Sequence, residues 1–137
     1  MPVQFSWDNP DHTLARYDFI GKWTWEEAHV AFRQSWSEIL KLSYTIDSVS
    51  DFSQSANIPS GVMTHLRTLA QNRPQNTRLM VFVGANPYLT LIVQTFNQLY
   101  HTVLKRELKL QFVKTLYEAR AVVAQLQADS DDQQALQ

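Results

Sequence analysis

A run of five consecutive apolar residues, Leu79–Val83, ends at Gly84. Such an unbroken run suits a strand that is covered on both faces, as in the middle of a parallel sheet. Soon after it, Asn86 offers a helix-capping side chain and Pro87 suits the first position of a helix. An apolar stripe from Leu89 to Val103 then predicts a long helix. The sequence therefore predicts a central strand followed by a covering helix, which is typical of α/β folds.

The residues before this unit predict two strands and a helix. Apolar and polar residues alternate over 3–7 and again over 13–20, with turn-forming residues between them, so we expect a hairpin. Thr24 and Glu27 have the spacing at which both side chains satisfy the first amides of a helix. This pattern predicts a helix from Thr24 to about Leu40.

The remaining patterns complete an alternating order of elements. β-branched and hydroxyl residues favour a strand within residues 43–52, and helical spacing predicts a helix from Val62 that Pro74 closes. Alternation over 108–112 predicts a last strand near a sheet edge. A second capping pattern opens a final helix over 115–126. The expected fold is α/β, a mostly parallel five-stranded sheet with an initial β-hairpin and four helices in the order ββαβαβαβα.

Composition bounds the domain and its setting. The chain has 137 residues, 45% of them hydrophobic and 18% charged, which suits one domain, assigned to residues 1–126. Residues 127–137 carry little apolar surface to offset the entropy of ordering them, so a flexible tail is expected. The absence of cysteine, of a secretory signal and of a long apolar run predicts a cytoplasmic protein without an integral membrane segment. The net charge of -1 argues against nucleic-acid partners.

No familiar enzyme or metal motif occurs in the sequence. Glycine-rich phosphate loops and the His-Glu-x-x-His pattern are missing. The histidines fall on a turn and three different expected helices, without the i, i+4 spacing of paired metal ligands. They are interpreted as surface or helix-edge residues: His12, His29, His65 and His101. We therefore expect no catalysis, no cofactor and no bound metal, and keep an enzyme that uses Asp51 or His65 as a third hypothesis.

Two loops at the carboxyl ends of the expected parallel strands are the candidate binding regions, because ligands and partners meet such sheets there. In the first, residues 51–61, Ser60 lies at a helix start, beside amide donors that would stabilise a phosphate. The alternative is that Asn57 or Ser60 caps that helix. The second loop, residues 84–88, is explained by capping, which leaves Tyr88 as the side chain with a polar tip to offer.

Trp23 and Trp25 flank the expected start of the first helix. Two large rings this close in sequence usually do not both enter one core, so one is expected to be exposed, as a partner surface or a ligand gate. The alternative is that Trp23 packs over the first turn of the helix. The basic cluster at 105–109 is interpreted as a solvated helix end.

The element order, together with Asp51-Phe52-Ser53 and Ser60-Gly61, resembles the STAS domain, and more narrowly its SpoIIAA-like branch of anti-sigma-factor antagonists. The resemblance spans residues 3–126. In that family a loop serine is phosphorylated by an anti-sigma kinase. The resemblance implies that Ser60 is a candidate phosphoacceptor. It also implies a partner-binding loop that includes Asp51, Ser53, Asn57 and Gly61.

Two functional hypotheses follow from this resemblance. The first is a non-enzymatic regulatory module that binds a protein partner, such as an anti-sigma kinase, with homodimerisation left open. The alternative is a carrier of a small molecule or lipid, because some relatives of this fold hold apolar ligands between sheet and helix. In that case a sheet–helix cavity would be lined by Trp23, Trp25, Phe96 and Tyr100.

Overall fold

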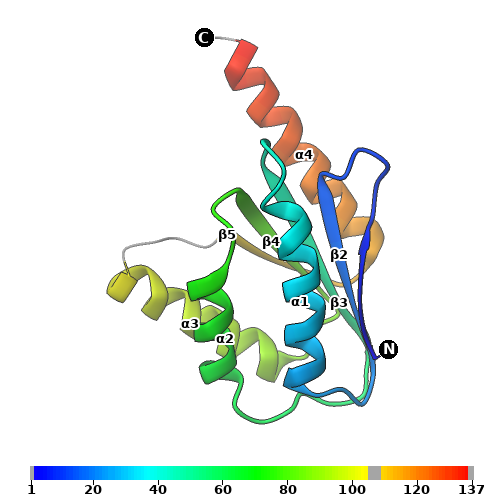
Figure 1. The fold of residues 1–137 in the computed structure, drawn as a ribbon, viewed down its shortest axis with the longest axis vertical. Coiled ribbons are helices and arrows are strands. Elements are labelled where there is room, and N and C mark those ends of the chain that lie inside the picture. Colours follow the sequence, from blue (N-terminus) through cyan, green and yellow to red (C-terminus); the bar gives the residue numbers. More distant parts are fainter. Residues whose placement is uncertain (1, 105–108, 136–137) are drawn as a thin grey trace.

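Strands and helices alternate along the chain after an initial pair of strands (Figure 1). The computed structural model describes residues 2–104 and 109–135, so most of the basic cluster at 105–109 lies outside the described residues. The strands are β1 (Val3–Trp7), β2 (Leu14–Gly21), β3 (Ile46–Ser55), β4 (Thr77–Val83) and β5 (Lys109–Val113). The helices are α1 (Trp25–Ile39), α2 (Val62–Asn72), α3 (Pro87–Leu104) and α4 (Leu116–Ala135). The predicted α/β fold and its element order are confirmed.

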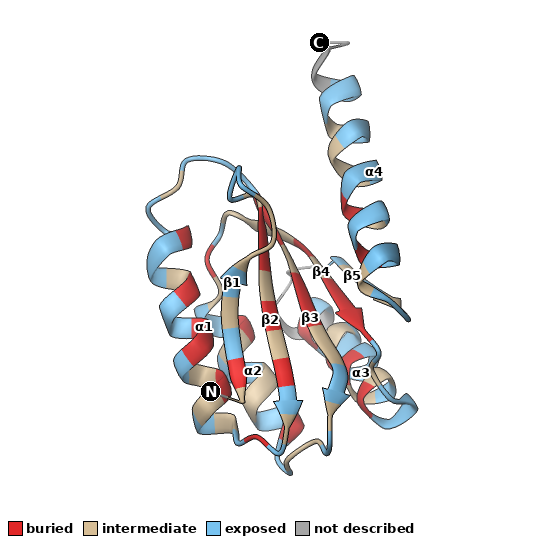
Figure 2. Ribbon diagram, turned by 90° about the vertical axis from the view of Figure 1, so that its right-hand side faces the viewer, coloured by how far each residue is buried: buried red, intermediate tan, exposed pale blue. Residues whose placement is uncertain are grey.

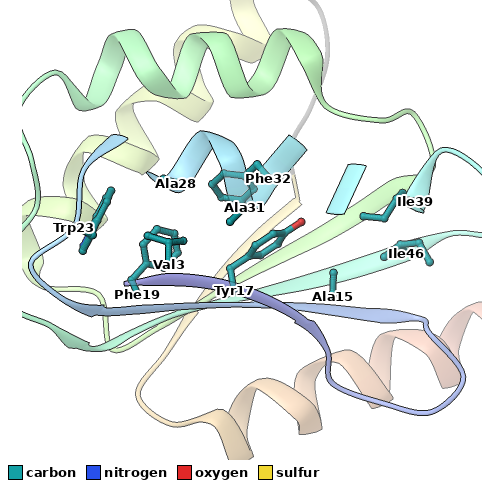
Figure 3. Close-up of a cluster of buried hydrophobic side chains, with 10 residues drawn as sticks. All are labelled: Val3, Ala15, Tyr17, Phe19, Trp23, Ala28, Ala31, Phe32, Ile39 and Ile46. Carbon is teal, nitrogen blue, oxygen red and sulfur yellow. The ribbon is translucent and has the colours of Figure 1, made fainter. Parts of the chain in front are cut away.

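The strands lie in the sheet in the same order as in the sequence. β1 pairs with β2 in antiparallel fashion, and the pairs β2–β3, β3–β4 and β4–β5 are parallel. β5 therefore lies at an edge, as its alternating pattern predicts. Because every parallel connection steps in the same direction, right-handed crossovers put α1, α2 and α3 on one face of the sheet. α4 covers the other face (Figures 1 and 3).

Three helices begin where the capping patterns predict, and at α4 Thr115 Oγ1 accepts a hydrogen bond from the Glu118 N–H (3.1 Å). Thr24 Oγ1 accepts a hydrogen bond from the Glu27 N–H (3.2 Å), and Glu27 Oε1 accepts one from the Thr24 N–H (3.0 Å), which makes a complete capping box at α1. At α3, Asn86 Oδ1 accepts a hydrogen bond from the Leu89 N–H (2.8 Å). The explanation of residues 84–88 as a capping loop is therefore confirmed for Asn86.

The largest buried cluster lies between α1 and the first three strands (Figure 3). Ala15, Tyr17 and Phe19 point from β2 toward α1, as strand alternation requires. Phe32 of α1 packs on Tyr17 with ring centroids 4.5 Å apart. The Tyr17 hydroxyl shares a hydrogen bond with the Ser35 hydroxyl (2.5 Å), and burial raises the pKa of Tyr17. The polar tip of this core residue is therefore satisfied inside the cluster.

β4 is buried on both faces, as its apolar run predicts. Val81 and Val83 pack in a cluster with Val123 of α4 on one face. Phe82 packs in a cluster with Leu89 of α3 on the other face. The strand therefore joins the two apolar layers of the domain.

α4 is longer than the sequence analysis predicts, because it continues past Leu126 to Ala135. Figure 2 shows that its last turns are largely exposed and extend beyond the sheet. A hydrogen bond from Arg78 Nη1 to Ser130 Oγ (2.8 Å) fastens this part of the helix. The predicted end of the helix at Leu126 rests on apolar burial alone, whereas polar contacts also hold the turns that follow. The flexibility expected for residues 127–137 stays a prediction, and residues 136–137 lie outside the described part.

Candidate functional site

The loop between β3 and α2, residues 56–61, is fastened at both of its ends. The Ala56 N–H donates to the carbonyl oxygen of Gly21 (2.8 Å), which ties the start of the loop to the end of β2. Trp25 Nε1 donates to the carbonyl oxygens of Pro59 (3.2 Å) and Ser60 (2.8 Å). This indole ties the end of the loop to the first turn of α1. The 56–61 loop is therefore held through its backbone, which leaves its polar side chains available.

A row of four phenylalanine rings crosses the sheet near this loop. Phe19, Phe52, Phe82 and Phe112 come from β2, β3, β4 and β5, with successive ring centroids 4.3, 6.1 and 5.1 Å apart. The successive ring planes lie within 19° of each other. Ile58 of the loop packs against the cluster that contains Phe82. Cross-strand aromatic pairs stabilise a sheet, so the loop rests on a rigid floor.

Trp23 and Trp25 connect this row to the 56–61 loop. Trp23 is only 3% exposed, packs edge-on against Phe19 (centroids 4.8 Å apart) and donates from Nε1 to Ser55 Oγ (2.9 Å). Trp25 is half-buried and lies edge-on to Trp23, with centroids 5.0 Å apart. The expectation that one of the two rings is exposed is wrong. Edge-to-face packing places both rings together, and each indole N–H has an acceptor.

Ser60 is exposed and lies directly before the N-cap residue of α2, which is Gly61. Gly61 has a φ of 84°, in the left-handed region that favours glycine, and no side chain caps the helix. The alternative in which Asn57 or Ser60 caps α2 is therefore wrong. The first turn of α2 holds no acidic residue either. The first amides of α2 therefore have no capping side chain, and the predicted phosphoacceptor directly precedes the N-cap residue.

Asp51 and Ser53, the other residues of the predicted partner-binding loop, lie on the opposite face of β3. Strand alternation puts them on the face that carries Asp47, toward α4. Asp51 Oδ1 accepts a hydrogen bond from the Ser53 N–H (2.9 Å). Together with Arg16 they line a shallow hollow of about 200 Å³. The structure thus divides the five predicted loop residues between two surfaces.

The second candidate loop, residues 84–88, contacts the first through the backbone of Gly84. A Cβ added at Gly84 would lie 3.0 Å from Ser53 Cα, and the φ of Gly84 is 66°. Glycine is therefore required there by close approach as well as by backbone conformation. Tyr88, the side chain singled out for its polar tip, is 57% exposed.

His29 on α1 and His65 on α2 meet beside the 56–61 loop. Their nitrogens Nε2 and Nδ1 are 2.9 Å apart, and the Trp25 ring stacks on His65 with centroids 4.7 Å apart and planes 11° apart. Burial, and then the charges of His65 and Arg33, lower the pKa of His29. The sequence analysis missed this pair because 36 residues separate its members. A usable signal was present, since Trp25 and His29 are four residues apart and share a face of α1.

A cavity of about 70 Å³ lies on the helix face of the sheet, between the strands and all three helices. Its lining comes from the amino ends of β3 and β4, where Ile46 and Thr77 lie, and from facing side chains of α1, α2 and α3. Of the four residues predicted to line such a cavity, Phe96 does so. Trp23 and Trp25 pack at the other end of the domain, near the 56–61 loop.

The fourth predicted lining residue, Tyr100, belongs to a separate small cluster. It is 3% exposed and packs with Phe96 and Ala70. Its hydroxyl donates to the carbonyl oxygen of Ala70 (3.2 Å), which joins α3 to α2. Tyr100 therefore supports the helix pair beside the cavity.

No family model, curated protein or solved structure matches the chain. Across residues 2–104 and 109–135, no helix combines the length and the apolar character needed to cross a bilayer. The order of strands and helices agrees with the STAS-like topology that the sequence suggests. The features that bear on function are therefore the 56–61 loop, the histidine pair and the cavity.

Proposed function

We propose that this chain is a non-enzymatic protein-binding module that presents the 56–61 loop and the outer face of α2 to a partner. The observation that carries the proposal is Ser60, which is exposed on a backbone held by Trp25, directly before the uncapped start of α2. A loop that is already ordered loses little conformational entropy when a partner binds. Such a loop suits reversible recognition.

The outer face of α2 extends this surface. Val62 and Ala70 are its buried residues, so most of the helix remains available for contact. Its exposed residues are Met63, Thr64, Arg67, Thr68, Gln71 and Asn72. Methionine adapts its shape to a partner, and arginine is enriched at interfaces. This mixed surface suits a partner that associates and dissociates.

Phosphorylation of Ser60 is the regulatory step that we propose for this surface. A phosphate adds about two negative charges at neutral pH. Those charges would lie beside the uncapped amides of α2, where the helix dipole stabilises an anion. A partner that binds the neutral loop would then meet an anionic one and lose affinity. The STAS resemblance suggests an anti-sigma kinase as such a partner.

A pull-down from the native cells tests this proposal. The baits are the natural chain, Ser60→Ala and Ser60→Asp, with Ser37→Asp as a matched control because Ser37 is exposed on α1, away from the loop. We expect one protein to be recovered with every bait except Ser60→Asp, and mass spectrometry to find phosphate on Ser60. A partner retained equally by Ser60→Asp and by the natural chain would contradict the assignment of this surface.

The cavity favours a second candidate function, the carriage of a small apolar molecule. An engineered apolar cavity of about 150 Å³ binds benzene. A cavity of about 70 Å³ suits a smaller aliphatic group or the end of a chain. Native mass spectrometry of the gently purified protein should retain an added mass, and Ala70→Leu, which fills the cavity, should remove it. A clean mass of the protein alone would contradict carriage.

A further inference from the structure

We propose that His29 and His65 form a two-imidazole binding site for a divalent transition metal ion of the zinc and copper class. The two nitrogens already converge, because His29 Nε2 and His65 Nδ1 are 2.9 Å apart. They come from different helices, α1 and α2, and both residues are half-buried. This inference does not depend on the proposed protein-binding function.

The distance between the two nitrogens fits a shared proton, and a metal ion requires the rings to move. At 2.9 Å the rings share one hydrogen bond, with a proton between them. Zinc binds imidazole nitrogen at about 2.0–2.1 Å with tetrahedral angles, which separates two such nitrogens by about 3.3 Å. The nitrogens therefore need to part by about 0.4 Å. The rings, whose centroids are 5.1 Å apart, must also turn so that both nitrogens face the same ion.

The surroundings of the pair fix the orientation of one imidazole. The Trp25 ring stacks on His65, and its N–H is anchored on the carbonyl oxygen of Ser60, so the plane of His65 is fixed. Arg33 opposes a cation here, since its charge acts on His29. Arg33 is exposed, and solvent weakens this repulsion.

The site leaves metal coordination positions open. Among the described residues, no group of three or more His, Cys, Asp or Glu side chains gathers anywhere to hold a metal ion. Water would fill the remaining positions, so binding is expected to be weaker and more exchangeable than at a closed four-ligand structural site. A bound ion would join α1 to the first turns of α2, four residues after Gly61.

Calorimetric titration of untagged protein with Zn²⁺ at neutral pH tests the site. We expect one Zn²⁺ per chain, and a loss of affinity of more than about tenfold in His29→Gln and in His65→Gln. His12→Gln and His101→Gln are the matched controls, because they remove the histidines that lie on a turn and on α3. Both controls should bind as the natural chain does, and Mg²⁺ should not bind, since it prefers oxygen ligands.

Two further measurements keep the test decisive. Arg33→Gln should tighten Zn²⁺ binding, because it removes the opposing charge. Cu²⁺ should bind more tightly than Zn²⁺, as imidazole sites generally prefer it. The ring nitrogens of His29 and His65 should shift in NMR spectra on adding Zn²⁺, and circular dichroism establishes that each variant is folded. Equal affinity in all four histidine variants, or no shift at His29 and His65, would overturn the proposal.

Discussion

The two faces of the sheet are held by different kinds of interaction. On the α4 face, ion pairs join distant elements: Arg78 pairs with Asp47 (2.8 Å), and Arg120 of α4 pairs with Asp8 (2.8 Å). On the face covered by α1, α2 and α3, the contacts are mainly aromatic and aliphatic, and the cavity lies among them. Four ion pairs between described residues lie on the α4 side.

This difference assigns different roles to the two faces. Directional bonds between charged groups fix α4 in one position on the sheet. Apolar packing around a void permits small adjustments of α2, since the atoms lining a void lack contacts on one side. The candidate loop and the histidine pair both adjoin α2. The 56–61 loop and the histidine pair therefore lie on the face of the sheet that also contains the cavity.

The largest expected effect is the loss of the buried carboxylate on the α4 face. The Asp47 side chain is 1% exposed and accepts hydrogen bonds from Arg78 and from the Leu79 N–H (3.1 Å). Asp47→Ala removes the partner of a charged group and should lower the free energy of unfolding by about 3 kcal/mol in urea denaturation. Asp18→Ala, which breaks a more exposed pair with Arg16, should cost less than about 1 kcal/mol. Equal losses of unfolding free energy in the two variants would contradict a larger role for the buried ion pair.

Enlarging one valine on each face should give effects of opposite sign. Val93 of α3 and Val123 of α4 are both 3% exposed, but only Val93 lines the cavity. Val93→Ile should stabilise the protein by up to about 0.8 kcal/mol, because the added methylene enters empty space. Val123→Ile should destabilise it by about 1–3 kcal/mol, because Val123 is packed inside the buried cluster between β4 and α4. Thermal unfolding of both variants checks the pair, and destabilisation by Val93→Ile would argue against an accessible void.

A smaller effect is expected from the indole that holds the 56–61 loop. Trp25→Phe keeps a ring against His65 but removes the N–H that donates to Ser60, so it should cost about 1 kcal/mol. Trp7→Phe is the control, because the buried Trp7 Nε1 has no acceptor among the described residues. Hydrogen exchange should quicken near residues 56–61 in Trp25→Phe and not in Trp7→Phe. Unchanged exchange would show that the loop is held by other contacts.

The smallest expected effects are on pH dependence, and they separate the two faces again. The folded-state pKa of His29 lies below its ordinary value of 6.5, mainly through burial. As the pH falls below 6.5, His29 is therefore protonated in the unfolded chain before it is protonated in the folded chain. The free energy of unfolding decreases as a result. Hydrogen bonding from Arg120 lowers the pKa of Asp8 below 3.8, so its contribution is present above 3.8 and lost as the pH falls further.

Urea midpoints measured across the acid range check both contributions. His29→Gln should flatten the plot of urea midpoint against pH just below pH 6.5 and leave the more acidic part of the plot unchanged. Asp8→Asn should flatten the part below pH 3.8 instead. If either variant altered both parts of the curve, the two faces would not titrate independently.

Local patterns predicted the fold because each element obeys a short-range rule. The capping box at Thr24, the alternation in β2 and the apolar run of β4 depend on residues within a few positions of one another. The candidate site depends on contacts across long separations. Trp25 reaches Ser60 over 35 residues, and His29 reaches His65 over 36. The spacing of Trp25 and His29 puts both on one face of α1, but it does not identify their partners.

Helix α4 illustrates the other limit of prediction. Its last turns carry few apolar residues, and the sequence analysis ends the helix at Leu126. A hydrogen bond from Gln127 to Asp47 (3.4 Å) and the one from Arg78 to Ser130 hold the turns of the helix that follow Leu126. These partners lie in β3 and β4, far away in the sequence. Composition describes the cost of ordering a segment but not the partners that offset it.

The strand order also bears on how the chain is assembled. Because neighbours in the sheet are neighbours in the sequence, no strand has to be inserted between two that have already paired. Each new strand can join the growing edge as it leaves the ribosome, and each parallel connection has to close around only one helix. α4 arrives last and covers the second face of a sheet that is already complete. A nascent chain that stalls before α4 would expose an apolar sheet face, and chaperones bind such surfaces.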